Sequence, residues 1–172
     1  MAGSLTYVKG DATQPAGTGP KLIPHVCNTV GGWGAGFVVA ISRKWGAPEE
    51  SYRRWHWSGG ATLGWVQPVM VEPDLWVINM IGQEGVGRAP DGTPPIRYEA
   101  LRICLGKVAR IAESKGASIH APKFGSALAG GSWSIIESIV QEELVDRGLD
   151  VSIYILPSEW IDEEQITNTG TH

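Results

Sequence analysis

Two glycine-rich segments are the parts of this sequence most able to do chemistry. The first follows Asn28 and reads NTVGGWGAGF, with four glycines between residues 31 and 36, and the second reads PKFGSALAGGSW over residues 122–133. Glycine inside regular structure costs about 0.5–1 kcal/mol relative to alanine, so such clusters indicate places where something approaches the main chain closely. Each segment precedes an apolar run with helical spacing, and the free N–H groups at a helix N-terminus attract phosphate. The two segments together predict facing loops that bind a long anion such as a pyrophosphate.

The familiar nucleotide-binding motifs do not fit these segments. A G-x-G-x-x-G pattern that begins at Gly32 fails because Phe37 occupies the last glycine position. Gly31 and Gly36 have the glycine spacing of a P-loop, but Phe37 follows where a lysine and a hydroxyl side chain are required. The sequence therefore argues against a magnesium-nucleotide enzyme and against an NAD-dependent oxidoreductase.

The elements that must position these loops are strands that alternate with helices. The run KLIPHVCN is almost continuously apolar, which is typical of a strand buried on both faces. We predict strands over 5–11, 21–28, 65–71, 75–82, 117–125 and 151–157, and helices over 37–45, 95–115 and 134–148. Pro68 indicates an edge strand, and the segment 82–95 is too rich in glycine and proline for regular structure. The pattern predicts one α/β domain over residues 1–160 with a mixed, mostly parallel sheet, followed by a polar tail over 161–172.

Two details of helix termini follow from the same patterns. Pro95 is expected in the first turn of its helix. Ser134 and Glu137 have the spacing of a capping box, although Ser132 is an alternative cap.

Composition excludes several classes of protein. A net charge of −4 and a pI of about 5.5 argue against a nucleic-acid or membrane-surface binder, which needs a basic surface. Cys27 and Cys104 form no C-x-x-C pair, so neither a zinc site nor a disulfide framework is indicated. No apolar run approaches the roughly 18 residues of a membrane helix, and no signal peptide is evident. We expect a monomeric cytoplasmic protein that uses no metal or cofactor.

In this order, the motifs resemble those of the macrodomain family of ADP-ribose-binding modules. The resemblance rests on VKGDA at 8–12, HVCNTVGGWGAGF at 25–37, PKFGSALAGGSW at 122–133 and SIYILP at 152–157. It covers residues 5–157 and is strongest to the branch that contains terminal ADP-ribose glycohydrolase and the ADP-ribose-1″-phosphate-processing proteins, especially bacterial members with an N-x-x-G-x-W-G-x-G-F loop. The resemblance implies a three-layer α/β/α fold and, as partners, ADP-ribose and ADP-ribosylated proteins.

The resemblance also implies a set of ligand contacts. Asp11 would accept a hydrogen bond from the adenine amino group, the Ala12 amide would contact the adenine ring, and Asn28 would contact the distal ribose. Leu156, with Pro157, would line the adenine pocket. The full set of implied ligand-binding residues is Asp11, Ala12, Asn28, Gly32, Trp33, Gly34, Ala35, Gly36, Phe37, Lys123, Gly125, Ser126, Ala127, Leu128, Ala129, Gly130 and Leu156.

Several of these residues also have a purely structural interpretation. Asp11 follows a glycine and suits a turn, and the Asn28 side chain suits a brace for its own loop. Trp33 is either a surface aromatic or a lid over the distal ribose, and Phe37 is either a ligand contact or the first core residue of its helix. His25 and Cys27 are interpreted as buried structural residues.

The resemblance leaves open whether the protein is an enzyme. The glycohydrolase branch uses a lysine near the end of the middle strand and an aspartate in the second loop, and here those positions align with Met80 and Ala129. Neither side chain can form a sugar adduct or relay a proton. What is left is a positioned water, with Asn28 and Ser126 as catalytic candidates and His25 or Glu84 as weaker ones.

The leading functional prediction is hydrolysis of ADP-ribose that is ester-linked to glutamate or aspartate side chains. Orientation of reactants alone can supply about 7–11 kcal/mol in favourable cases, which is enough for a labile acyl ester. The alternatives are removal of a 1″-phosphate from ADP-ribose, and binding of ADP-ribose without catalysis.

Overall fold

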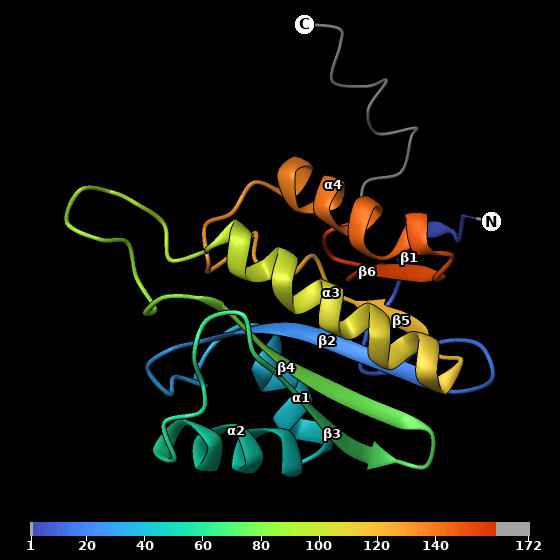
Figure 1. Cartoon of the computed structure of the whole chain (residues 1–172), viewed down its shortest axis with the longest axis horizontal. Coiled ribbons are helices and arrows are strands. Elements are labelled where there is room, and N and C mark those ends of the chain that lie inside the picture. The colour runs from blue at the N-terminus through green and yellow to red at the C-terminus, as the bar shows by residue number, and fades with distance from the viewer. Residues whose placement is uncertain (1, 161–172) are drawn as a thin grey trace, which may run out of the picture.

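The computed structural model describes residues 2–160 of the chain, and the predicted tail at 161–172 lies outside the described residues (Figure 1). Its strands are β1 Leu5–Lys9, β2 Lys21–Asn28, β3 Val66–Glu72, β4 Leu75–Gln83, β5 Ser118–Ala121 and β6 Val151–Ile155. Its helices are α1 Phe37–Lys44, α2 Ala47–Trp57, α3 Tyr98–Lys115 and α4 Trp133–Glu143, with a 3₁₀ turn η1 at Val145–Arg147. All six predicted strands are therefore present, with boundaries that differ by up to four residues.

The sheet has the order β1-β6-β5-β2-β4-β3. Every neighbouring pair from β1 to β4 is parallel, and only β3 runs antiparallel, against β4. The predicted mixed, mostly parallel sheet is confirmed. The carboxyl ends of five neighbouring strands consequently meet at one edge of the sheet, which is where open α/β sheets bind ligands.

Helices cover both faces of this sheet, as a three-layer arrangement requires. On one face, α3 and α4 pack over a buried cluster that includes Ile78, Leu105 and Ile136 (Figure 1). On the other face, α1 and α2 pack over a second cluster that includes Ile41 and Tyr52. The central strand β2 contributes to both clusters, which explains its nearly continuous apolar sequence.

The strand β3 forms one edge of the sheet, as the proline in its sequence predicts. Pro68 lies opposite Ile78 of β4, and the ladder is irregular between Met70 and Glu72. Proline has no N–H to donate, so it is tolerated on an edge strand and not in the middle of a sheet.

The structure corrects three expectations about helices. The helix α2 was not predicted at all, because only Pro48 and Tyr52 of its eleven residues are buried and no apolar stripe results. The helix α3 begins at Tyr98, because the backbone of Arg97 is extended and its N–H bonds to Gly82 O. At α4 the N-cap is Ser132, and its side chain makes no capping hydrogen bond, so there is no capping box.

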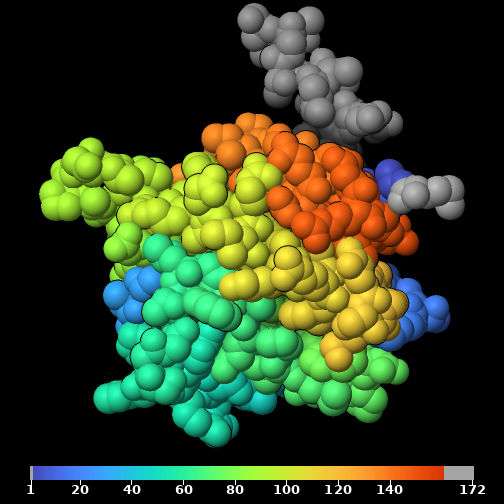
Figure 2. All heavy atoms as spheres, in the orientation of Figure 1, coloured from blue at the N-terminus to red at the C-terminus, as the bar shows by residue number. Residues whose placement is uncertain are grey.

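The segment between β4 and α3 is a loop, as predicted for 82–95. It projects from the body of the molecule at the end where the strands finish (Figure 1 and Figure 2). The tip forms a turn of its own, in which Ala89 N donates to Thr93 O over 2.9 Å and Gly92 N donates to Ala89 O over 2.8 Å. Within residues 2–160, no helix is both long enough and apolar enough to span a bilayer.

Candidate functional site

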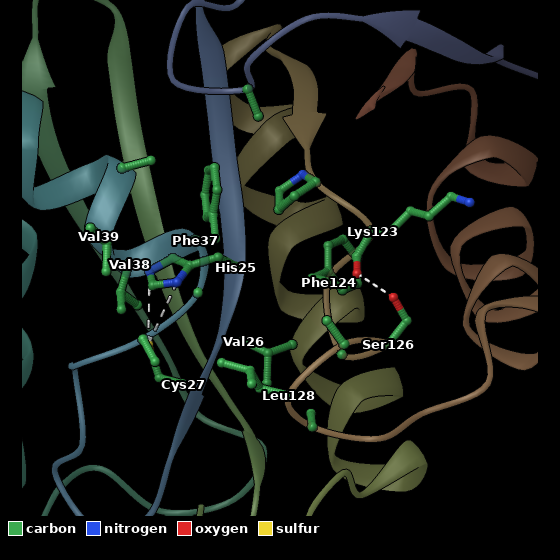
Figure 3. Close-up of a pocket in the computed structure, with 18 of the residues that line it drawn as sticks. His25, Val26, Cys27, Phe37, Val38, Val39, Lys123, Phe124, Ser126 and Leu128 are labelled. Carbon is green, nitrogen blue, oxygen red and sulfur yellow. Dashed lines mark hydrogen bonds between the residues drawn. The ribbon is translucent and has the colours of Figure 1, made fainter. Parts of the chain in front are cut away.

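A cleft of about 860 Å³ lies along the carboxyl ends of the parallel strands. Its walls come from the ends of β1, β2, β4 and β6 and from both glycine-rich loops, which are called here loop one (residues 29–36) and loop two (residues 122–132). Figure 3 shows side chains of β2, α1 and loop two around it, with Phe37 and His25 on one side of β2 and Phe124 and Ser126 on the other. The volume is within the range of about 300–1,000 Å³ that ligand-binding pockets occupy.

The backbone of both loops presents unpaired donors to this cleft. Within residues 2–160, the N–H groups of residues 33–36 in loop one and 125–129 in loop two make no hydrogen bond. All nine of these residues line the cleft. Unpaired N–H groups at the start of α1 add to the positive potential of loop one. The cleft can therefore hold an anion without a cluster of basic side chains, as the glycine content predicts.

One glycine lets the two loops approach each other, and another lets loop two pack against the core. Gly36 has a φ of 84°, and a Cβ built there would lie 3.1 Å from Leu128 Cδ1 of loop two. Gly125 has a φ of 77°, and a Cβ there would lie 3.0 Å from Ile96 Cδ1 and 3.1 Å from Ile136 Cδ1. Any other residue would be strained at these angles and crowded by those neighbours. The expectation that the two loops face each other is confirmed.

The side chain of Asn28 braces loop one. Its Oδ1 accepts hydrogen bonds from Val30 N and Gly32 N, both over 3.0 Å, and its Nδ2 donates to Gly32 O over 2.8 Å. From α2, Tyr52 OH lies 2.6 Å from Asn28 O and 2.8 Å from Oδ1. The structural interpretation of Asn28 is thus correct, and one of its two Nδ2 hydrogens is left to face a ligand. Its contact with a distal ribose stays a prediction.

At the other end of the cleft, Asp11 forms a turn as well as part of the wall. Its Oδ1 accepts hydrogen bonds from Thr13 N and Thr13 Oγ1, both over 2.8 Å. No described residue bonds to Oδ2, so this oxygen is available to a ligand. The same segment is tied to β6, because Ala16 N donates to Tyr154 OH over 2.9 Å.

The order of the sheet separates these two ends. Asp11 follows β1, and Asn28 ends β2, with β6 and β5 between them. Residues beyond β4 extend the cleft one strand further. Four strand spacings amount to about 19 Å, so the cleft suits an elongated ligand that lies across the strand ends.

His25 is held as a neutral structural side chain. It is 2% exposed, and its Nε2 donates to Asn79 Oδ1 over 2.6 Å; Asn79 Nδ2 in turn donates to Pro48 O. Burial lowers the pKa of His25 to about 4. The Sγ of Cys27 lies 3.8 Å from His25 Nε2, and burial raises the pKa of this thiol well above its usual value. Neither group is placed or charged to carry protons at neutral pH.

The two aromatic residues of loop one and α1 form an inner wall of the cleft. Trp33 is buried, its Nε1 donates to Ser42 Oγ over 2.7 Å, and its ring packs edge-on against His25 with the centroids 5.3 Å apart. Its interpretation as a surface aromatic is therefore wrong. Phe37 packs against the same core and also lines the cleft, so its two interpretations are compatible.

Two polar residues of loop two line the cleft in different ways. Ser126 Oγ donates to Lys123 O over 2.7 Å, which stabilises the turn (Figure 3). The side chain of Lys123 extends away from the other labelled residues, and its Nζ lies 5.8 Å from the Trp133 ring centroid.

Four residues named from the sequence lie outside the cleft, and Pro157 is one of them. Met80 is fully buried beneath α3, since its side chain alternates onto the face of β4 that carries the larger core cluster. Glu84 turns away and pairs with Arg97, with 3.3 Å between its Oε2 and Arg97 Nη2. Gly130 is directed toward the projecting loop, because a Cβ there would meet Pro94 Cβ at 2.9 Å. All other predicted ligand contacts line the cleft.

Several residues that line the cleft were not predicted from the sequence. Those with polar groups or at the ends of the cleft are Gln83, Val86, Arg43, Tyr154 and Glu159. Gln83, and not Met80, is the β4 residue at the cleft. Gln83 reaches the cleft through a shift in the pairing of β2 with β4 after Cys27, and no pattern in the sequence predicts that shift. Among residues 2–160, no group of three or more His, Cys, Asp or Glu side chains is arranged to hold a metal ion.

The solved structures that are similar to this chain include the following two, each matched over nearly its whole length. A protein of unknown function from Bacteroides thetaiotaomicron is 50% identical, with a TM-score of 0.88, over 90% of this chain and 99% of that one. A macrodomain protein from Streptomyces coelicolor is 48% identical, with a TM-score of 0.78, over 88% of this chain and 99% of that one.

Comparison with curated proteins gives more distant relatives, and no family model matches the chain. The mouse protein "Chromodomain-helicase-DNA-binding protein 1-like" is 28% identical over 164 residues, which is 90% of this chain but only 18% of the mouse protein. The chain thus spans less than a fifth of that relative. An ADP-ribose 1″-phosphate phosphatase from Candida albicans is 24% identical over 144 residues, or 80% of this chain and 92% of that protein. On the fold, the two loops and the Streptomyces relative, this chain belongs to the macrodomain family.

Proposed function

We propose that this macrodomain binds ADP-ribose across the cleft and hydrolyses the ester that links ADP-ribose to glutamate or aspartate side chains of modified proteins. The observation that carries the proposal is the set of unpaired N–H groups on the residues with which both loops line one cleft. A diphosphate is the part of ADP-ribose that such donors suit.

The two ends of the cleft suit the two ends of that ligand. The free Oδ2 of Asp11 is an acceptor for the adenine amino group, at the β1 end. At the β2 and β4 end, Asn28 can donate one N–H to the distal ribose. A diphosphate between them would lie over the loop amides, and the span of about 19 Å matches an extended nucleotide-sugar.

Hydrolysis by a positioned water suits the groups that line the cleft. Met80 and Ala129 align with the lysine and the aspartate of the glycohydrolase branch, and the β4 residue that lines the cleft is Gln83. None of these three side chains is a nucleophile or an acid. The water oxygen would bond to the anomeric carbon of the distal ribose as the bond from that carbon to the carboxylate oxygen breaks. The carboxylate leaves with the electron pair, and the proton of the water passes to a diphosphate oxygen and then to solvent.

Titration calorimetry tests the binding proposal. We expect ADP-ribose to bind at least about tenfold more tightly than AMP, because AMP lacks the second phosphate and the distal ribose. The variant Gly36→Ala should lose ADP-ribose binding, since its Cβ would meet Leu128 between the loops. Gly92→Ala is a matched control with a φ of 87° and open space around its Cβ, at the tip of the projecting loop. Equal affinity for AMP and ADP-ribose, or equal loss in both variants, would contradict the proposal.

Release of ADP-ribose from a glutamate-linked ADP-ribosylated protein tests the catalytic proposal. We expect stoichiometric release of free ADP-ribose by catalytic amounts of the protein. Binding in the calorimeter without release would leave the chain as a non-catalytic ADP-ribose binder.

Removal of a 1″-phosphate is a second candidate activity, which the name of the Candida albicans relative favours. Phosphate release from ADP-ribose 1″-phosphate, compared with release of ADP-ribose from the ester substrate at the same protein concentration, decides between the two.

A further inference from the structure

We propose that Gln83 is a catalytic residue of this hydrolysis, and that its side-chain carbonyl accepts a hydrogen bond from the attacking water. This inference rests on the proposed function and adds the group that holds the water. Gln83 ends β4 and lines the cleft at the distal-ribose end.

A shift in strand pairing places Gln83 at this position. Cys27 of β2 pairs with Ile81, but the next residue, Asn28, pairs with Gln83. Without the shift Gly82, which has no side chain, would lie opposite Asn28. Irregularities of this kind re-aim side chains and are common beside active sites. The shift thus brings two side-chain amides together at one end of the cleft.

Hydrogen bonds fix the orientation of the Gln83 amide. Its Nε2 donates to Gly85 O over 2.8 Å, and a carbonyl oxygen can only accept, so the nitrogen is the atom on that side. The N–H of the same Gly85 donates to Thr29 Oγ1 over 3.1 Å, which ties this turn to loop one. The Gln83 amide is therefore held through its nitrogen by a turn that is itself tied to loop one.

The oxygen of this amide is free and accessible. Within residues 2–160 no hydrogen bond reaches Gln83 Oε1, and no side-chain oxygen or nitrogen among these residues is both buried and unpaired. Because Gln83 is only half-buried and lines the cleft, Oε1 is open to it. It can accept a hydrogen bond from a water and leave the lone pair of that water directed at the anomeric carbon.

The neighbouring polar side chains of Asn28 and Glu84 cannot accept a hydrogen bond from the attacking water. Asn28 Oδ1 already accepts from two backbone N–H groups and lies within 2.8 Å of Tyr52 OH, so Asn28 is left with a hydrogen to donate. Glu84 pairs with Arg97 outside the cleft. The two amides are thus complementary: Asn28 offers a donor to the distal ribose and Gln83 offers an acceptor to the water.

Steady-state kinetics on the ester-linked substrate test this role with three variants of Gln83. We expect Gln83→Ala and the similarly sized Gln83→Met to lower kcat about 10- to 100-fold, while KM and the Kd for ADP-ribose change less than twofold. Gln83→Glu keeps an acceptor oxygen and should retain more activity than Gln83→Met, with a kcat that rises with pH as the carboxyl ionises.

Gln141→Met is the matched control, because Gln141 is also half-buried and uses its Nε2 in one hydrogen bond, to Asp146 Oδ1 of the η1 turn. Its kcat should equal that of the unmodified protein. Two results overturn the catalytic role of Gln83 and leave the proposed hydrolysis standing. One is full activity of Gln83→Met, and the other is a loss of ADP-ribose affinity large enough to explain the whole fall in activity. Absence of turnover by the unmodified protein overturns the proposed hydrolysis, and the role of Gln83 with it.

Discussion

Two polar residues of the cleft use one part of the side chain for the fold and keep another for a ligand. Asp11 uses Oδ1 for the turn at Thr13, and among residues 2–160 nothing bonds to its Oδ2. Asn28 uses Oδ1 and one Nδ2 hydrogen for hydrogen bonds within loop one. For both residues the structural interpretation is correct and does not exclude the functional one. A simple truncation to alanine would mix the two effects.

The variants Asp11→Asn and Asp11→Ala separate these effects. Asparagine keeps an oxygen to accept from Thr13 but turns the free acceptor into an N–H₂ donor, whereas alanine removes both. We expect both variants to bind ADP-ribose about tenfold or more weakly in titration calorimetry, and only Asp11→Ala to lower the melting temperature. Unchanged affinity in Asp11→Asn would limit Asp11 to its turn.

For single residues, the sequence predicts the site well where a residue type has few possible structural roles. The glycine clusters indicate the anion site, the resemblance to macrodomains implies Asp11 at one end of the cleft, and nearly all of the predicted contacts line it. The sequence places Met80 at the cleft, but the structure places it in the core. The register of β4 decides which face a side chain lies on, and a shift of one residue moves a side chain from the core face to the other face. Gln83 was missed for the same reason.

Among the elements, α2 shows how a helix can position a site without an apolar stripe. Tyr52 from this helix is fully buried and bonds to Asn28, and Arg53 Nη1 donates to Gly31 O over 3.1 Å. The helix thus fixes loop one through polar contacts. Apolar periodicity is the main sequence signal for a helix, and α2 lacks it because only two of its eleven residues are buried.

Removal of one hydroxyl from α2 should loosen loop one. We expect Tyr52→Phe to lower the free energy of unfolding by about 1–2 kcal/mol, because the Asn28 oxygens lose a buried donor. The affinity for ADP-ribose should fall several-fold. Urea unfolding measures the loss of stability, and titration calorimetry measures the loss of affinity.

Tyr7→Phe provides the comparison for that experiment. Tyr7 OH is also partly buried, bonds to Glu137 and accepts from Trp133 Nε1 over 2.8 Å, and Tyr7 does not line the cleft. It should lose stability without losing affinity. If both variants bind ADP-ribose as tightly as the unmodified protein, α2 does not control loop one.

For the molecule as a whole, the sequence predicts the layers but not the order of the strands. The alternation of strands and helices is a local pattern, and it predicts an α/β fold with a mostly parallel sheet. The three layers are what the resemblance to macrodomains implies. The order β1-β6-β5-β2-β4-β3 depends on pairings between distant segments, such as β1 with β6. That order sets the length of the cleft and decides which strand ends share it.

Global stability should fall as the pH is lowered from 6.5 toward 5. Burial lowers the pKa of both His25 and His120 to about 4, below the usual 6.5. Between these values the unfolded chain binds protons that the folded protein does not, so acid favours unfolding. We expect a loss of about 1 kcal/mol per histidine between pH 7.5 and 5.5, or roughly 2–4 °C each in melting temperature.

Differential scanning calorimetry across this pH range measures the effect, and His25→Gln supplies the control. This variant is less stable at neutral pH but should show a shallower fall with acid, since it lacks one of the two buried imidazoles. A melting temperature that stays constant from pH 7.5 to 5.5 would contradict the expectation.

The edge strand β3 has a consequence for the behaviour of the protein at high concentration. A second chain that adds a strand to an exposed sheet edge needs an unbroken row of donors and acceptors. Pro68 supplies no donor, and the irregular pairing between Met70 and Glu72 interrupts the row again. This edge is consequently a poor template for fibril growth, and replacing Pro68 with valine would remove one of its two safeguards.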